Sequence, residues 1–207
     1  MAYHDKGTIR GRCAGSTMST AVRFTAQQFD RMVASGIFEE PYESRIELIF
    51  GELREMPPPG LLHEDYVDFL MEWSGDMLPR KRAKVRVQQT VGIPELDSIP
   101  LPDIAWVARR RYQDRRPQTS DVWLIIEVAD SSLEYDLGEK QLLYSQAGIK
   151  EYWVVNARMK CVEVFRRPTK KGYRDAQAYS VSDVLSPLTV PQAVPSIREL
   201  FAGDDRR

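Results

Sequence analysis

Cysteine is scarce in this chain, and the two that it has stand far apart. Cys13 and Cys161 have no neighbouring cysteine and no histidine at the spacing of metal ligands. The sequence therefore offers neither a zinc knuckle nor a redox-active pair of thiols. We do not expect thiol chemistry to be the basis of its function.

Long apolar runs are missing too. No stretch approaches the roughly 18 to 20 apolar residues that a membrane span needs. Residues 1–6 lack the apolar segment of a secretory signal. From these two absences we expect a cytoplasmic protein without a membrane partner.

Charge of one sign is not in excess. The 29 Lys and Arg residues stand against 30 Asp and Glu, so the net charge of −1 gives no overall field that would attract nucleic acid. The basic residues are clustered, however. Fifteen of the 29 fall in three short windows, residues 80–86, 109–116 and 166–174. Two interpretations stay open for each window, a solvated loop or strand edge and a track for phosphates.

The composition is that of a folded protein. With 207 residues, of which 43% are hydrophobic and 29% charged, the chain is long enough to bury a core without disulfides or metals. Residues 1–20 are rich in Gly, Ser and Thr and show no periodicity. We expect a flexible N-terminal extension over 1–20 and a single domain over 21–203.

The hydrophobic pattern alternates between helical and strand periods. A capping-box spacing of Thr25 and Gln28 begins the first expected helix, and Gly36 ends it. The elements expected after it are two strands within 45–56 that meet near Gly51, a helix over 62–77 closed by Pro79, a strand over 84–91, an extended connection over 94–102, strands over 103–108 and 122–129, a helix over about 136–147, strands over 151–155 and 162–166, and a tail over 186–201 with a short helical turn led by Ser196.

Glu127 is the first candidate for chemistry. Residues 122–129 are apolar on both alternating faces except at this position, which is typical of a central strand covered on both sides. An unpaired ionised carboxylate there costs several kcal/mol. Glu127 must therefore have a metal, a cationic partner or a raised pKa.

Two further residues point to the same place. Asp103 stands at the head of the neighbouring expected strand, after a proline and 24 residues before Glu127. At 100° per residue, Lys140 lies beside Asp136 on the inward face of the next helix, together with Leu137, Leu143, Tyr144 and Ala147. Two acids and a lysine facing one point would suit a site that handles phosphate. The alternative is a buried Glu127–Lys140 ion pair, with Asp103 as a hydrogen-bonding residue at a strand end.

The order of these residues resembles a known family. Pro102-Asp103 comes first, then Glu127-Val128-Ala129 in an apolar strand, then Asp136 and Lys140, and finally Tyr144, Gly148 and Glu151-Tyr152-Trp153. Upstream, residues 47–53, the proline-rich break and His63 fit the opening pattern. Over about residues 24–201 the chain is similar to a restriction-endonuclease family of uncharacterised role within the PD-(D/E)xK nuclease superfamily.

The resemblance implies a fold and a metal site. The fold would be α/β, a restriction-endonuclease-like core with a mixed central β-sheet flanked by helices. Asp103, Glu127 and the backbone carbonyl of Val128 would bind Mg²⁺, with Mn²⁺ as a substitute. Glu47 is either an additional acid near the metal or an exposed strand carboxylate. The superfamily's motif lysine would stand at Ala129, so its role passes to Lys140, which would orient or help to deprotonate the attacking water.

The activity implied by the resemblance is hydrolysis of DNA phosphodiester bonds, with a homodimer as a family-level expectation. The alternative is a catalytically inactive nuclease fold that serves as a DNA-binding or interaction module. His63 would cap the helix that follows it, form a hydrogen bond in the core or touch substrate. Tyr144 and Trp153 are expected in the core. The basic windows 80–86 and 109–116 are candidates for phosphate contacts.

Overall fold

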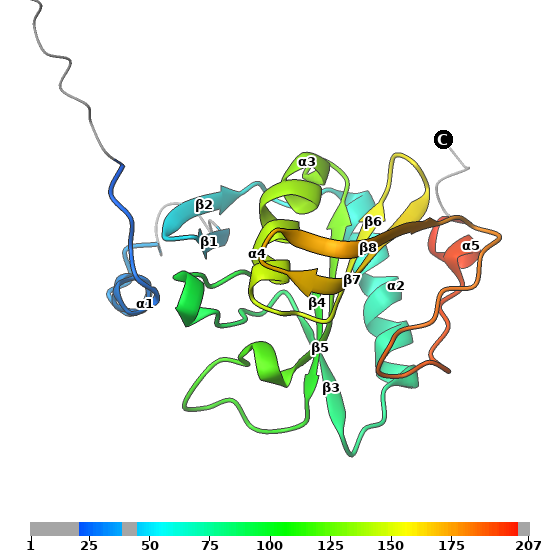
Figure 1. The fold of residues 1–207 in the computed structure, drawn as a ribbon, viewed down its shortest axis with the longest axis horizontal. Helices are drawn as coiled ribbons and strands as arrows, with labels where there is room; N and C mark the ends of the chain where they lie inside the picture. The colour runs from blue at the N-terminus through cyan, green and yellow to red at the C-terminus, as the bar shows by residue number, and fades with distance from the viewer. Residues whose placement is uncertain (1–20, 39–44, 203–207) are drawn as a thin grey trace, which may run out of the picture.

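A six-stranded sheet forms the centre of the computed structural model, which describes residues 21–38 and 45–202 (Figure 1). Its strands follow one another in sequence order. They are β3 (Ala83–Val87), β4 (Ile104–Ala108), β5 (Val122–Ala129), β6 (Glu151–Asn156), β7 (Cys161–Thr169) and β8 (Gly172–Tyr179). All neighbours are antiparallel except β5 and β6, which are parallel. The sheet is therefore mixed, and β5 lies inside it, as expected.

The parallel pair dictates where the next helices lie. Parallel strands cannot be joined by a tight turn and need a crossover, which here is helical. It consists of α3 (Leu133–Tyr135), a π-helical turn η3 (Asp136–Lys140) and α4 (Gln141–Gln146). Leu143 and Tyr144 of this crossover are buried against sheet residues such as Ile125 and Val154. The crossover thus brings its side chains onto the face of the sheet that carries Glu127.

The opposite face is covered by α2 (Leu61–Met77), by α5 (Ile197–Leu200) and by the tail that leads to α5 (Figure 1). Trp73 of α2 packs on two sheet residues, with ring centroids 5.0 Å from Trp106 and 5.9 Å from Trp153. The indole of Trp106 donates a hydrogen bond to Ser74. These aromatic contacts fix α2, and with it the position of His63 in its first turn.

A separate hairpin lies beside the sheet. It consists of β1 (Arg45–Ile49) and β2 (Glu52–Met56) and is preceded in the chain by α1 (Ala26–Ala34). Its two-residue turn has φ of 49° at Phe50 and 80° at Gly51, the positive values that a type I′ turn requires. A Cβ at Gly51 would lie 3.0 Å from Cβ of Arg23 and 3.1 Å from the carbonyl oxygen of Phe24, so glycine is needed there. The turn sets the register that places Glu47 toward the crossover.

Most of the predicted elements are confirmed. The Thr25–Gln28 capping box is formed in full at the start of α1, and Ser196 caps α5 through the backbone N–H of Glu199. Strand β3 ends at Val87 and not at residue 91, because Gln88 has a φ of 48° and leaves the extended conformation. The connection over 94–102 contains a 3-10 turn, η1 (Pro94–Leu96), and a second one, η2 (Thr119–Asp121), precedes β5.

One further boundary was wrong, and one strand was missed. The helix after β5 begins at Leu133, about one turn before Asp136. Strand β8 was not predicted, because as an edge strand it is largely solvated and lacks an alternating apolar pattern. Residues 1–20 lie outside the described residues, so the extension and the domain division remain predictions. Among the helices that the structure describes, none has the length and apolar character needed to cross a membrane.

Candidate metal and phosphate site

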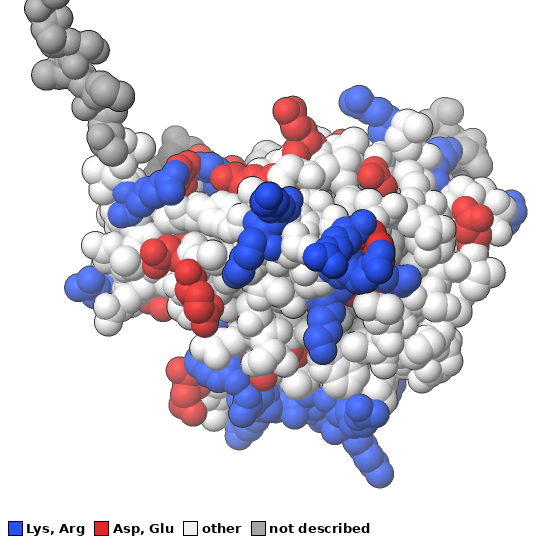
Figure 2. All heavy atoms as spheres, in the orientation of Figure 1, with Lys and Arg blue, Asp and Glu red and all other residues white. Residues whose placement is uncertain are grey.

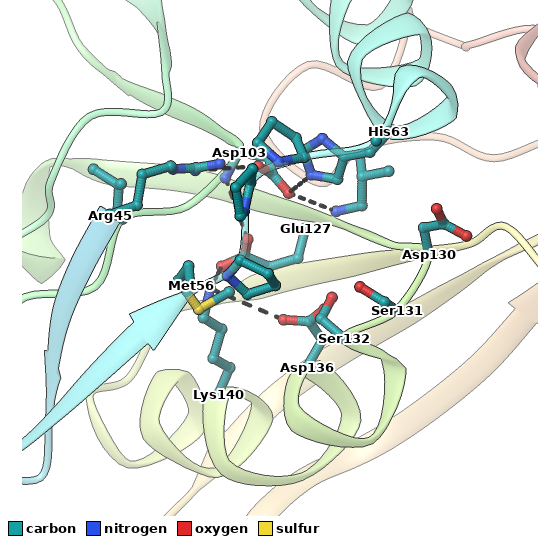
Figure 3. Close-up of a pocket in the computed structure, with 16 residues that line it drawn as sticks. Arg45, Met56, His63, Asp103, Glu127, Asp130, Ser131, Ser132, Asp136 and Lys140 are labelled. Carbon is teal, nitrogen blue, oxygen red and sulfur yellow. Dashed lines mark hydrogen bonds and ion pairs between the residues drawn. The ribbon is translucent and has the colours of Figure 1, made fainter. Parts of the chain in front are cut away.

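A pocket of about 60 Å³ opens where β4 and β5 meet the crossover and the proline-rich segment after β2 (Figure 3). Four carboxylates line it, those of Asp103, Glu127, Asp130 and Asp136, and so do His63 and Lys140. These side chains come from the head of β4, from β5, from the turn after β5, from η3 and from α2. The three candidates that the sequence singled out therefore share one pocket.

Asp103 is held by contacts on both of its carboxylate oxygens. Oδ2 accepts a hydrogen bond from the backbone N–H of Val128 at 2.9 Å and lies 3.0 Å from Nε2 of His63. Oδ1 has only long contacts, at 3.4 Å from Nε2 of Gln88 and at 3.8 Å from the guanidinium of Arg45. Burial alone would raise the pKa of Asp103, but His63, the Val128 N–H and Lys140 outweigh it and hold the pKa below its ordinary value. Asp103 is therefore an ionised carboxylate with spare capacity at Oδ1.

Glu127 is almost fully buried, at 2% exposure. Its Oε1 accepts hydrogen bonds from Nζ of Lys140 at 3.0 Å and from the hydroxyl of Tyr144 at 2.8 Å. Its Oε2 accepts one from the backbone N–H of Asp103 at 3.2 Å. Burial and the charges of Asp103, Asp136 and Glu47 raise the pKa of Glu127 well above its ordinary value, against the opposing effect of Lys140.

Lys140 reaches the acids from the π-helical turn. Such turns are rare and occur frequently at functional sites. The Lys140 Nζ lies 3.0 Å from Glu127, 3.2 Å from Glu47 and 3.9 Å from Asp136, and the side chain is 2% exposed. Burial lowers its pKa, but the three carboxylates together raise it well above the ordinary value. Lys140 is therefore a fixed positive charge, not a free amine.

Glu47 belongs to the same cluster without lining the pocket. It is fully buried, so the alternative of an exposed strand carboxylate is wrong. Its Oε1 accepts the backbone N–H of Leu101 at 2.6 Å, and Oε2 lies 3.3 Å from the hydroxyl of Tyr135. The metal role of Glu47 stays a prediction, and its contacts in the structure are those of a residue that positions Lys140.

The cluster as a whole carries an excess of negative charge. Lys140, the one buried cation among the residues that the structure describes, stands against four carboxylates, those of Glu47, Asp103, Glu127 and Asp136. Burial, with Asp103 and Glu47, raises the pKa of Asp136 to about 6, although Lys140 and Ser132 oppose this. A divalent cation would relieve the same repulsion.

The donor set fits a hard divalent cation, although no preformed cage is present. Among residues 21–38 and 45–202, no three or more His, Cys, Asp and Glu residues are arranged to hold a metal. Asp103, Glu127 and Val128 nevertheless line one pocket. Oδ1 of Asp103 and Oε2 of Glu127 retain free lone pairs, and such oxygens are the ligands that Mg²⁺ prefers.

The sequence missed several contacts of this site. No local sequence pattern marked three of the residues involved, Arg45, Gln88 and Tyr135. The partners of Arg45 and Tyr135 lie more than 40 residues away in the chain, and Gln88 meets Asp103 only through the pairing of two strands. Tyr144 was assigned to the core, and it is fully buried there, yet its hydroxyl also holds Glu127. Trp153 lies in the core as expected. His63 forms a hydrogen bond with Asp103 and does not cap α2, and its contact with substrate stays a prediction.

The mixed sheet with acids at the head of β4 and inside β5 defines a restriction-endonuclease-like α/β protein. A family model described as "Putative restriction endonuclease" (Uma2) matches residues 26–198, and the chain belongs to this family. A search of curated proteins found no match.

The fold is shared with a solved structure. The crystal structure of "a putative nuclease belonging to DUF820" from Anabaena variabilis superposes with a TM-score of 0.68 at 15% sequence identity. The match covers 86% of this chain and 98% of the other. At this identity the likeness concerns the fold, and it agrees with the α/β core expected from the sequence.

Proposed function

We propose that the protein is a divalent-metal-dependent endonuclease that hydrolyses phosphodiester bonds of DNA at this pocket. One observation carries the proposal: Asp103, Glu127 and Lys140 converge on a single pocket with an excess of carboxylates. Membership of the family supports nuclease chemistry. A purely structural ion pair between Glu127 and Lys140 would not need the second acid or the opening to solvent.

Asp103, Glu127 and the carbonyl of Val128 are the residues that would hold Mg²⁺ or Mn²⁺. The bound cation would supply Lewis-acid polarisation of the scissile phosphate and charge stabilisation at the pocket. His63 and the Val128 N–H keep the Asp103 carboxylate oriented and ionised. The Asp103 N–H and the Tyr144 hydroxyl keep the carboxylate of Glu127 oriented.

Lys140 would act through its charge. Its Nζ is held by three carboxylates, and its raised pKa is the opposite of what a general base requires. We therefore assign Lys140 to orienting the attacking water and to offsetting negative charge on the phosphate, and not to removing a proton. The absence of a lysine at motif position 129, which is Ala129, is compatible with this role of Lys140. The crossover places the Lys140 ammonium group 3.0 Å from Glu127.

Metal removal tests the proposal directly. Supercoiled plasmid and a labelled duplex oligonucleotide are incubated with the protein in Mg²⁺, in Mn²⁺ and in EDTA. We expect nicking or strand cleavage with either metal and none in EDTA, because without a divalent cation the carboxylates of the pocket would repel a phosphate. Absence of cleavage under all conditions, together with salt-sensitive DNA binding, would support the inactive binding module instead.

His63 provides a finer prediction. Replacing His63 by Ala removes one of the two partners of Asp103 Oδ2 and leaves the Val128 N–H. Loss of a group that orients a ligand typically costs 10- to 100-fold in metal affinity or activity. We expect His63→Ala to lower the cleavage rate by about this factor, with the loss partly recovered at high Mn²⁺. His63→Asn, which keeps a polar group there, should lose less. Equal cleavage rates for wild type and His63→Ala would show that His63 does not contribute to catalysis.

A further inference from the structure

The basic windows 80–86 and 109–116 meet around one aromatic ring. Cationic groups of Lys84, Arg86, Arg110 and Arg115 lie over the ring of Tyr112, at 4.9, 5.6, 5.9 and 5.9 Å from its centroid. Figure 2 shows basic side chains gathered at the lower edge of the molecule, where β3 and the loop after β4 lie in Figure 1. The name Tyr112 platform is used below for the five basic residues Lys84, Arg86, Arg109, Arg110 and Arg115 around this ring.

The platform is short of negative charge. Asp121 forms ion pairs with Arg110 and Arg115, at 3.2 and 2.6 Å. Within the described parts of the chain, no carboxylate forms an ion pair with Lys84, Arg86 or Arg109. Burial lowers the pKa of Lys84, and so do its neighbours Arg86 and Arg109. Cations held this close to one another favour a bound anion.

Arg86 supplies an independent observation. Its Nε is buried and has no hydrogen-bond partner among the described residues. A buried donor without a partner costs about 1–3 kcal/mol, and a phosphate oxygen is the acceptor that a guanidinium pairs with best. Arg86 therefore carries hydrogen-bonding capacity that the described residues leave unused.

The strand register connects the platform to the pocket. Arg86 pairs with Ala105 of β4, which pairs with Ile125 of β5, so these three side chains point to one face of the sheet. Glu127 is two residues beyond Ile125 and points to the same face, about 7 Å further along the strand. The platform and the carboxylate pocket therefore lie on the same side of the sheet, with Arg86 as the platform residue nearest the acids.

Tyr112 indicates how the platform would bind. Its hydroxyl donates to the carbonyl oxygen of Ala108, and cations crowd its ring. The ring therefore orders the basic side chains and leaves little surface on which a base could stack. Preordered cations without an available aromatic face suit backbone phosphates, which carry no sequence information.

We infer that the Tyr112 platform binds the phosphate backbone of duplex DNA on the same face of the sheet as the carboxylate pocket and holds the duplex during cleavage. This inference rests on the proposed function for its partner, DNA. It goes beyond that function in assigning the binding surface to one edge of the sheet, at β3.

The test measures binding without cleavage. Anisotropy of a labelled DNA duplex is followed in EDTA over a series of KCl concentrations, for wild type and for the triple variant Lys84→Gln, Arg86→Gln, Arg109→Gln. The matched control is the triple variant Lys150→Gln, Lys171→Gln, Arg174→Gln. It removes the same charge from exposed positions at the half of the sheet formed by β6, β7 and β8. Circular dichroism verifies that both variants are folded.

Each phosphate contact contributes about 0.9 to the slope of log K against log salt. We expect the platform variant to bind about tenfold or more weakly and its slope to fall by about 2 to 3, while the control keeps wild-type values. Equal binding by wild type and the platform variant, or an equal loss in the control, would overturn the inference. So would displacement of the duplex by poly-glutamate or by double-stranded RNA at lower concentration than by unlabelled DNA.

The two proposals fail separately. If the protein cleaves DNA in Mg²⁺ and the platform variant binds DNA as tightly as wild type, the nuclease proposal stands and the platform proposal is wrong. If salt-sensitive DNA binding depends on the platform but no condition gives cleavage, the platform proposal stands and the nuclease proposal is wrong.

Discussion

Asp103→Asn and Glu127→Gln are each expected to reduce DNA cleavage about 1,000-fold or more. Both changes keep the shape of the side chain and remove the negative charge that a divalent cation needs, which is worth several kcal/mol of transition-state stabilisation. Asn at 103 can still accept the Val128 N–H, so this variant should fold. The measurement is the single-turnover cleavage rate of a duplex oligonucleotide in Mg²⁺, together with calorimetric titration of Mn²⁺.

Asp130→Asn is the matched control for these variants. Asp130 lines the same pocket but is solvent-exposed, and among the described residues it forms no ion pair with Lys140. We expect its cleavage rate to stay within a few-fold of wild type. A rate for Asp103→Asn or Glu127→Gln equal to that of Asp130→Asn would exclude the tested acid from catalysis.

Lys140→Met is expected to give the largest loss of stability of any single change at the site. Methionine fills a similar volume but leaves Glu47, Glu127 and Asp136 without their buried counter-charge. Removing one partner of a buried ion pair typically costs about 3–5 kcal/mol, because the other charge stays behind in a medium of low dielectric constant. Urea unfolding followed by circular dichroism measures this loss. Lys150→Met, at an exposed position of the following turn, should change stability by no more than about 0.5 kcal/mol.

A second substitution separates charge from packing. In Lys140→Met, Glu127→Gln, one of the stranded carboxylates is neutral, so we expect the double variant to regain at least about 1 kcal/mol over Lys140→Met alone. It should remain inactive, since both the metal ligand and the ammonium group are gone. A double variant less stable than Lys140→Met would show that volume, and not charge, explains the loss.

Local patterns in the sequence were enough to find the main candidates. Glu127 interrupts an otherwise apolar strand, and Lys140 lies on the inward face of a helix, so each violates a burial rule that can be checked residue by residue. Asp103 was added because it stands at the head of the neighbouring expected strand, directly after a proline. The capping box at Thr25 and the central position of β5 followed from the same kind of local reasoning.

Contacts between segments far apart in the chain were beyond such reasoning. Glu47 reaches Lys140 only because the type I′ turn sets the register of the β1–β2 hairpin beside the crossover. The helical periodicity did not predict the π-helical turn that carries Lys140. Strand β8 stayed hidden because an edge strand needs no apolar face.

The sequence by itself determined that a carboxylate and a lysine would be buried, since apolar periodicity decides which side chains leave water. Only the tertiary structure decided their partners. The pairing of β3, β4 and β5 brings Gln88 to Asp103 and Asp103 to Glu127. The loop after β4 brings Arg110 and Arg115 around Tyr112, beside Lys84 and Arg86. The physical reason is that burial depends on the pattern within one segment, whereas electrostatic contacts depend on strand register and loop path, which the packing of the whole chain fixes.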